Sequence, residues 1–315
     1  MAYRVRPIAV DKLKTYPLRS RPSKVTPAQF ARPTRSADPV RRLLKNLPDL
    51  LAARDFRALV SKMELARRRK RAILWGLGAH VLKTGLSPVL IDLMKSGWVS
   101  GIALNGAGII HDFELAYAGR TSEDVAARIG SGRFGMARET GELLNETIRS
   151  GAGEGLGLGE AVGRMIARSD FPHRRLSLLG EAWRLGIPVT VHVAVGTDIL
   201  HLHPSASGEA IGKTSLLDFK LFCGLVEKLD GGGVFLNVGS AVILPEVFLK
   251  AVSLVRNVRP RLDGFTTAVF DFQKLYRPAE NVVRRPVGRT GSGFYFVGHH
   301  EIMIPLLAAA LAAGR

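Results

Sequence analysis

Five histidines fall in polar clusters, where acid–base chemistry or metal binding is expected. They are His111, His201 with His203, and His299 with His300. Histidine changes charge near neutral pH, so these side chains could move protons or bind a substrate. Together with Asp112, Asp198 and Glu301 they could instead supply the imidazole and carboxylate ligands of a divalent metal. Spacing alone leaves both interpretations open, because the ligands would come from separate loops.

One stretch joins an apolar run to a small-residue turn and then to a helix-like segment. Residues 102–104 predict a buried strand, residues 105–108 (Asn-Gly-Ala-Gly) a turn, and residues 109–116 a helix. This plan places backbone N–H groups and a helix N-terminus at the carboxyl edge of a parallel sheet, where a nucleotide can bind. The stretch lacks the spacing of the six-residue dinucleotide fingerprint, so an ordinary strand-to-helix connection is equally open.

The rest of the sequence supplies the strands and helices that would position these groups. Further strands are predicted by apolar runs at residues 72–76, 186–195, 233–238, 263–269 and 293–297. Helix-like segments separate these runs, which predicts an α/β fold with a Rossmann-like parallel sheet flanked by helices. Several runs end in Gly, Thr, Asp, Asn or His. Ligands of such sheets gather at the edge where the strands end.

The positive charge is concentrated at the N-terminal end. The chain of 315 residues has a net charge of +18, and residues 1–71 hold 20 Lys and Arg against 5 Asp and Glu. We expect a basic extended arm at 1–38, N-terminal helices at 39–71 and an α/β domain at 72–315. The nearly neutral body argues against a nucleic-acid-binding fold. The arm is expected to bind an anionic partner or to pack on a neighbouring subunit.

Three features bear on the surroundings of the protein. The basic run at residues 67–71 is typical of a solvated helix end, with an anionic partner as the alternative. The single cysteine, Cys223, excludes an internal disulfide and fits a small core side chain. The apolar tail at 302–313 is too short to span a bilayer, and the N-terminus lacks a signal pattern. These features predict a cytoplasmic protein without a membrane span.

Two glycine-rich segments come close to phosphate-binding loops. Residues 208–215 resemble a P-loop but have three residues between the glycines where the motif needs four, and no strand directly precedes them. Residues 151–159 carry alternating glycines and likewise follow no strand. We therefore reject an ATPase and expect a helix connector or flexible lid at 151–159.

From about Ala72 onward the chain resembles the deoxyhypusine synthase family. Residues 105–112 (Asn-Gly-Ala-Gly-Ile-Ile-His-Asp) are similar to the family's Thr-Ala-Gly-Gly-Val-Glu-Glu-Asp motif, and residues 196–198 to its Leu-Thr-Asp. Residues 266–268 and 298–307 fall on two further motifs. The resemblance implies an NAD-binding fold and a homo-oligomer, a tetramer or dimer. It places these residues around NAD: Thr84, Asn105, Gly106, Ala107, Gly108, Asp198, Thr267, Ala268, His299 and His300.

The chain departs from that family at its reacting residues. The family's lysine motif Ala-Val-Ser-Trp-Gly-Lys falls on residues 279–286, which contain neither Trp nor Lys. Arginine stays protonated and cannot replace a lysine nucleophile. We therefore expect an NAD-dependent enzyme acting on a small amine or polyol rather than deoxyhypusine formation. His111, His201 and His203 are the predicted proton-transfer groups, and Glu246 or Glu301 is predicted to hold a substrate cation.

Two other functions stay open on the sequence. Metal-assisted hydrolysis or lyase chemistry would use the histidine clusters without a nicotinamide. A non-catalytic nucleotide-binding protein would keep the same strand tips and bind partners through the basic arm. All three hypotheses share a small-molecule ligand at the carboxyl edge of the sheet.

Overall fold

A six-stranded parallel sheet lies at the centre of the computed structural model, which describes residues 13–27, 30, 44, 46–259 and 261–312. Its strands are β2 (Ile73–Leu77), β3 (Gly101–Asn105), β5 (Val189–His192), β6 (Val234–Val238), β7 (Thr266–Asp271) and β8 (Ser292–Val297). They lie in the order β5-β3-β2-β6-β7-β8, and each neighbouring pair is parallel. The predicted α/β fold with a Rossmann-like sheet is confirmed.

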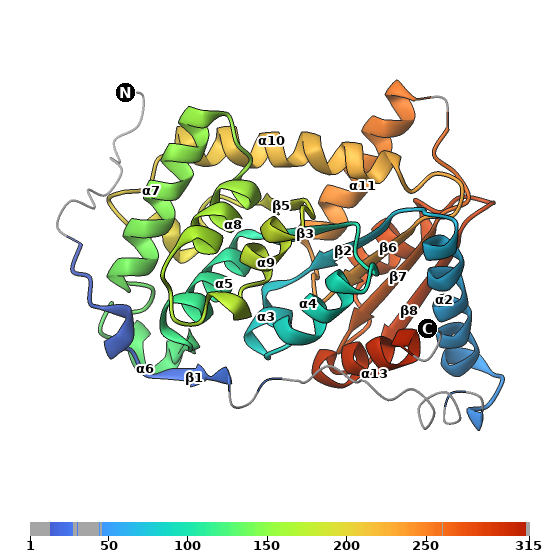
Figure 1. Ribbon diagram of the computed structural model, residues 1–315, viewed down its shortest axis with the longest axis horizontal. Helices are drawn as coiled ribbons and strands as arrows, with labels where there is room; N and C mark the ends of the chain where they lie inside the picture. Colours follow the sequence, from blue (N-terminus) through green and yellow to red (C-terminus); the bar gives the residue numbers. More distant parts are fainter. Residues whose placement is uncertain (1–12, 28–29, 31–43, 45, 260, 313–315) are drawn as a thin grey trace.

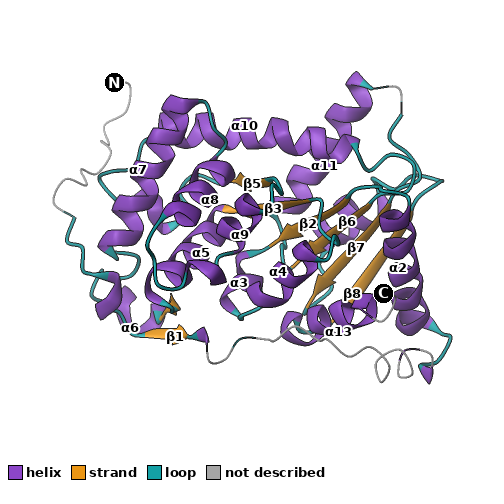
Figure 2. Ribbon diagram, viewed as in Figure 1, coloured by secondary structure: helices purple, strands orange, loops and turns teal. Residues whose placement is uncertain are grey.

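Helices cover both faces of this sheet (Figure 2). One face packs against α2 (Leu51–Arg68), α4 (Ser87–Lys95), α5 (Gly106–Ala118) and α13 (His300–Ala312), and the other against α10 (Gly208–Glu227) and α11 (Ile243–Val258). Beyond β5, the first layer continues with α7 (Arg138–Glu154), α8 (Leu158–Arg168) and α9 (Leu178–Arg184). Strands covered on both sides must be apolar throughout, and all residues of β2, β6 and β7 are buried.

Short elements complete the chain. They are η1 (Leu18–Ser20), β1 (Ser23–Val25), α3 (Ala79–Lys83), β4 (Thr121–Glu123), α6 (Val125–Ile129), η3 (Arg174–Leu176), η4 (Ile199–Leu202), α12 (Tyr276–Pro278) and η5 (Ala279–Arg284). The predicted connector at 151–159 joins α7 to α8, and the near P-loop at 208–215 is the start of α10. None of the described helices is long and apolar enough to cross a membrane.

The described part of the N-terminal arm packs on its own chain. Strand β1 pairs antiparallel with β4, so that Ser23 faces Glu123 and Val25 faces Thr121. The side chains of Leu18 and Arg21 are buried. Figure 1 shows this segment lying along α5, α6 and α7. Residues 13–27 therefore form part of one wall of the α/β domain. The rest of the predicted arm, apart from Phe30, and residues 39–43 of the predicted N-terminal helices lie outside the described residues.

Candidate cofactor and substrate site

The order of the strands locates the edge at which a ligand is expected. Counted along the chain, the six strands lie in the order 3-2-1-4-5-6, which is the order of dinucleotide-binding Rossmann sheets. The order reverses between β2 and β6, and ligands of such sheets bind outside the carboxyl ends of the strands at that point. We call this the carboxyl edge. It contains the tip of β2 at Gly78, the tip of β3 at Asn105 and the tip of β7 at Asp271.

Two glycine turns meet at the reversal point. The N–H of Gly78 donates to the carbonyl of Val238 (2.8 Å), and the N–H of Gly239 to that of Phe270 (2.9 Å). A Cβ atom at Gly78 would lie 1.9 Å from the carbonyl oxygen of Gly239. Only glycine fits this contact. Residues 76–78 (Gly-Leu-Gly) therefore match the first half of the dinucleotide fingerprint, while Val81 stands at the place of its third glycine.

Two acceptors lie at the tip of β3: Asn105 of the strand itself, and Asp198 of the loop before η4, whose side chain also accepts from the backbone N–H of His201. The amide oxygen Oδ1 of Asn105 is buried and has no hydrogen-bond partner among the described residues. The carboxylate of Asp198 lies against Gly106, where an added Cβ would be 1.9 Å from Oδ2. Burial raises the pKa of Asp198 from 3.8 to about 6. Rossmann folds bind a ribose diol at the tip of their second strand, so both groups lie at the expected place.

A cavity of about 170 Å³ opens beside Asp198. Its walls come from the arm, from α5, from β4, from the segment between α6 and α7, and from η4 with the loop before it: Arg21, Ala107, Ile110, His111, Glu114, Glu123, Phe134, Thr197, Asp198 and Ile199. Pockets for drug-sized ligands measure roughly 300–1,000 Å³, so this one suits a small polar group rather than a whole dinucleotide. A dinucleotide would have to lie along the open carboxyl edge.

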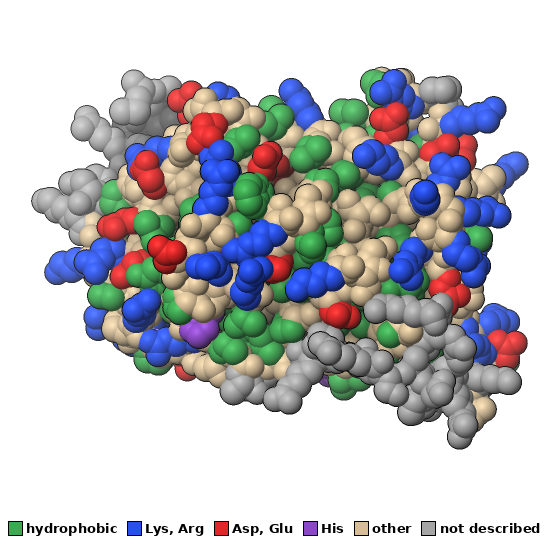
Figure 3. All heavy atoms as spheres, viewed as in Figure 1, with side chains coloured by type: hydrophobic (Ala, Val, Ile, Leu, Met, Phe, Trp, Pro, Cys, Tyr) green, Lys and Arg blue, Asp and Glu red, His purple; other side chains and the backbone are tan. Residues whose placement is uncertain are grey.

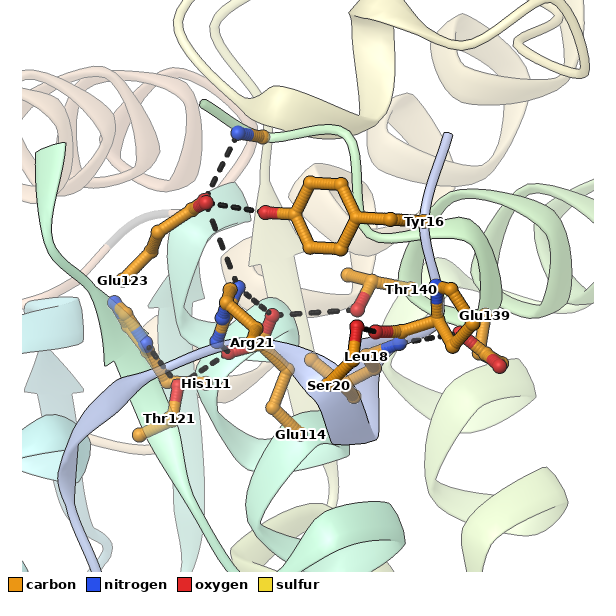
Figure 4. A network of polar contacts seen from close by, with 12 residues as sticks. Tyr16, Leu18, Ser20, Arg21, His111, Glu114, Thr121, Glu123, Glu139 and Thr140 are labelled. Atoms are coloured by element: carbon orange, nitrogen blue, oxygen red, sulfur yellow. Dashed lines mark hydrogen bonds and ion pairs between the residues drawn. The ribbon is translucent and has the colours of Figure 1, made fainter. Parts of the chain in front are cut away.

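A network of buried charges forms the arm side of this cavity (Figure 4). The guanidinium of Arg21 donates to both oxygens of Glu114 (2.8 and 2.6 Å) and lies 3.8 Å from Glu123. The hydroxyl of Tyr16 donates to Glu123, and burial together with that carboxylate raises the tyrosine pKa. Thr140 donates to Glu114 (3.2 Å). A buried ion pair needs such additional partners to offset its desolvation, and they hold the arm at this wall.

The same network fixes the proton of His111. The hydroxyl of Thr121 donates its one hydrogen to Glu114 (2.5 Å), so Nδ1 of His111 must donate to the threonine oxygen (2.8 Å). Nε2 of His111 is then an acceptor. Burial lowers the pKa of His111 from 6.5 to about 4, and the charges of Lys83 and Arg21 act in the same direction while Glu114 opposes them. His111 is therefore a neutral imidazole at pH 7.

Two further histidines, His80 and His300, lie together near the reversal point. The rings of His80 and His300 are 5.6 Å apart, and Nε2 of the buried His300 donates to the carbonyl of Phe270 (3.2 Å). Although part of the His80 side chain is exposed, partial loss of water around its ring lowers its pKa. The charges of Lys83 and His300 lower this pKa further. At the tip of β7, Oδ1 of buried Asp271 has no partner among the described residues. Neither His80 nor Asp271 was among the residues predicted from the sequence, although His80 follows the glycine turn after β2 and Asp271 is the last residue of β7.

Two predicted cofactor residues lie away from the carboxyl edge. Thr267 and Ala268 are fully buried near the beginning of β7, and the hydroxyl of Thr267 donates to the carbonyl of Val282 (2.8 Å). The strand continues to Asp271, so the residue at its tip is Asp271 and not the predicted pair.

Two other predicted cofactor residues, Thr84 and His299, lie beside groups of the protein. Thr84 follows the last residue of α3, and its hydroxyl donates to carbonyls of that helix. The predicted His299 is exposed and lies 3.8 Å from Glu301.

Three of the predicted catalytic residues are already engaged elsewhere. Nδ1 of His201 accepts from the N–H groups of Gly196 (3.1 Å) and Asp198 (3.3 Å). His203 is buried, with Nε2 3.0 Å from the carbonyl of Gly135. Glu246 lies on α11, on the other face of the sheet, and pairs with cations there. Of the four predicted catalytic residues, only His111 lines the cavity.

The histidine clusters do not converge on a metal site. Among the described residues, no three His, Cys, Asp or Glu side chains are grouped as metal ligands would be. His111, His203 and His300 instead use ring nitrogens on protein groups. The metal-dependent alternative therefore has no candidate ligand set in the described part of the chain.

Comparison with known proteins gives likeness at the level of the fold. No family profile and no curated protein matches the sequence. AgrE in binary complex with L-arginine superposes with a TM-score of 0.51 at 14% identity, covering 88% of this chain and 34% of that one. AgrE has also been solved in a ternary complex with ornithine and NAD+. This chain thus spans about a third of the length of AgrE.

Two further structures are similar. A conserved LOR/SDH protein from Methanococcus maripaludis S2 has a TM-score of 0.50 at 13% identity, covering 90% of this chain and 71% of that one. A deoxyhypusine synthase from Entamoeba histolytica has a TM-score of 0.46 at 10% identity, covering 82% and 87%. The resemblance of the sequence to the deoxyhypusine synthase family stays a prediction.

Proposed function

We propose that this chain binds NAD along the carboxyl edge and uses it to oxidise or reduce a small polar substrate. One observation carries the proposal: a Rossmann strand order with a buried, unpartnered Asn105 Oδ1 and a buried Asp198 carboxylate at the tip of the second strand. An unpartnered buried acceptor is costly unless a ligand supplies the donor. The NAD+ bound by AgrE, a protein of similar fold, supports the same cofactor.

Asn105 and Asp198 would accept hydrogen bonds from the ribose hydroxyls of the adenosine half. A carboxylate at this place repels the additional phosphate of NADP, which selects NAD. The diphosphate would lie at the glycine turn of Gly78, near the ammonium group of Lys83. Lys83 lowers the pKa of both His80 and His111 by its charge, so it lies near both, and it forms no ion pair with a described carboxylate.

The nicotinamide half would then lie at the tips of β6 and β7, and the substrate beside it. Oδ1 of the buried Asp271, which has no partner among the described residues, lies there and suits an amine or polyol, because it can accept a hydrogen bond from a hydroxyl or an amine. The small cavity with the neutral His111 would lie beside the adenosine half. The bound NAD would supply hydride chemistry. His80, an exposed imidazole that is neutral at pH 7, can take up the proton released when a hydroxyl or amine is oxidised.

Titration calorimetry of NAD into the full chain tests the cofactor site. We expect saturable binding, weakened about tenfold by Asn105→Ala, since a hydrogen bond in a buried site contributes roughly 1–2 kcal/mol. Asn257→Ala is the matched control, because Asn257 is exposed on α11. The absence of NAD binding by the unaltered chain would contradict the proposal, as would equal weakening by the two variants.

The enzymatic part has its own test. A screen of small amines and polyols with NAD, followed by NADH absorbance, should find a substrate whose turnover falls in His80→Ala while NAD affinity is retained. If NAD binds but no compound is turned over, the nucleotide-binding protein without catalysis is the better description.

A further inference from the structure

The opposite edge of the sheet, where the strands begin, contains a hollow of about 430 Å³. Its rim carries Arg67, Lys70 and Arg71 from the end of α2 and the segment after it, and Lys228 from the end of α10. Its floor and remaining wall are Ala72, Leu74, Gly97, Ser100 and Leu225. Figure 3 shows Lys and Arg side chains gathered over the right of the view, where the strands begin. We call this the amino edge.

The four cations of this hollow are not neutralised by the protein. None of them forms an ion pair with a carboxylate in the described part of the chain, although the adjoining carboxylate Glu227 is paired with Arg259 (2.9 Å). Three helices, α2, α4 and α10, end near the hollow, and each C-terminus carries a partial charge of about −0.5. Four full positive charges outweigh these partial charges, so the hollow has a positive potential.

Two of the polar groups are already placed for a ligand. The guanidinium of Arg67 lies over the ring of Trp98, 4.5 Å from its centroid, and this stacking restricts its position. The hydroxyl of Ser100 accepts from the N–H of Ile73 (3.0 Å), and its own hydrogen has no acceptor among the described groups. A concave site with fixed cations and a free hydroxyl donor suits phosphate oxygens.

We propose that this hollow binds a small molecule with several phosphate groups. Its volume is that of a pocket for a single small ligand, and four cations line it. A neighbouring hollow shares Arg71 and Lys228 and adds two carboxylates, Glu227 and Asp230, together with two cations, Arg259 and Arg261. The charges that it adds therefore cancel, and the excess positive charge belongs to the first hollow. The site is separate from the proposed NAD site, because the two lie at opposite ends of the strands.

Inorganic tripolyphosphate is the probe, titrated by calorimetry into the full chain at constant ionic strength. The double variant Arg71→Ala with Lys228→Ala should weaken binding about tenfold or more, because two charge-assisted contacts are lost. Lys213→Ala with Lys220→Ala is the matched control: it removes the same charge from the exposed face of α10 and should change the affinity less than about twofold. Equal weakening by both pairs, or no binding, would overturn the proposal.

Two further measurements locate the bound phosphate and test a nucleic acid as the competing ligand. Trp98 emission should change on tripolyphosphate binding, and Trp98→Phe should abolish this change; a fluorescence change that persists in Trp98→Phe contradicts binding at Arg67. A single-stranded oligonucleotide that binds more tightly than tripolyphosphate and loses affinity in the Arg71 and Lys228 variant would replace the proposal with a nucleic-acid surface. Asn105→Ala should leave tripolyphosphate affinity unchanged, so failure at one edge is distinguishable from failure at the other.

Discussion

The two edges of the sheet differ in how far their charged side chains are exposed to solvent. At the carboxyl edge, ionisable groups are buried and their pKa values shift toward the neutral form, as for Asp198 and His111. At the amino edge, the cations are exposed around an open hollow. Burial makes protonation states depend on surroundings, which proton transfer requires, whereas exposed cations suit the binding of a charged ligand. On this contrast we propose the NAD-dependent reaction for the carboxyl edge and the binding of a phosphate ligand for the amino edge.

The largest expected difference concerns arginine at the two edges. Arg21→Met should lower the free energy of unfolding by about 3–5 kcal/mol, because it leaves the buried Glu114 carboxylate without its partner. Arg71→Met removes an exposed guanidinium and should change stability by no more than about 0.5 kcal/mol. Urea unfolding of both variants measures the contrast. Similar values for the two would remove the distinction between a buried network and a surface charge.

Glycine substitutions give a smaller contrast. Gly78→Ala should destabilise by about 2–3 kcal/mol, since its Cβ would clash with the backbone of Gly239. Gly97→Ala at the amino edge meets no atom closer than 3.8 Å, and its φ of +74° alone should contribute about 1 kcal/mol. Thermal unfolding monitored by circular dichroism would compare them. A Gly78→Ala variant as stable as Gly97→Ala would contradict the close contact of the two strand tips.

The smallest expected effect depends on pH. Because the folded-state pKa of Asp198 is raised from 3.8 to about 6, its contribution to stability is present below pH 4 and lost as pH rises through 6. Asp198→Asn removes the ionised form. The variant should be more stable than the original chain by about 2 kcal/mol at pH 8, and the difference should shrink toward pH 4. Urea unfolding at both values tests this; a difference independent of pH would contradict burial of the charge.

The sequence was sufficient for the strands and for part of the site. Apolar runs identify all six strands, and small polar residues at their ends identify Asn105 and Asp198. The run predicted at 263–269 stops two residues before the strand does, because Phe270 and Asp271 continue it. Thr267 and Ala268, which the family resemblance placed around NAD, lie buried inside this strand. The roles of His201 and His203 could not be predicted, because backbone groups outside their own polar cluster occupy their ring nitrogens.

The partners of Arg21 could not be predicted from the sequence either, because its contact with Glu114 joins residues far apart along the chain. Nothing in the arm distinguishes Arg21 from its other basic residues before the fold brings it to Glu114. His80 and Asp271 could have been predicted from the sequence, because His80 follows the turn after β2 and Asp271 ends β7. Whether their atoms have partners depends on packing, which residue types do not reveal.

Hydrogen–deuterium exchange of the full chain, with and without NAD, tests the central claim most directly. We expect NAD to slow exchange at residues 78–85, 105–111 and 196–203, which form the carboxyl edge, and to leave residues 67–71, 97–100 and 225–231 unchanged. Tripolyphosphate should produce the reverse pattern. Protection by NAD at the amino edge, or at neither edge, would contradict the assignment of the cofactor to the strand tips.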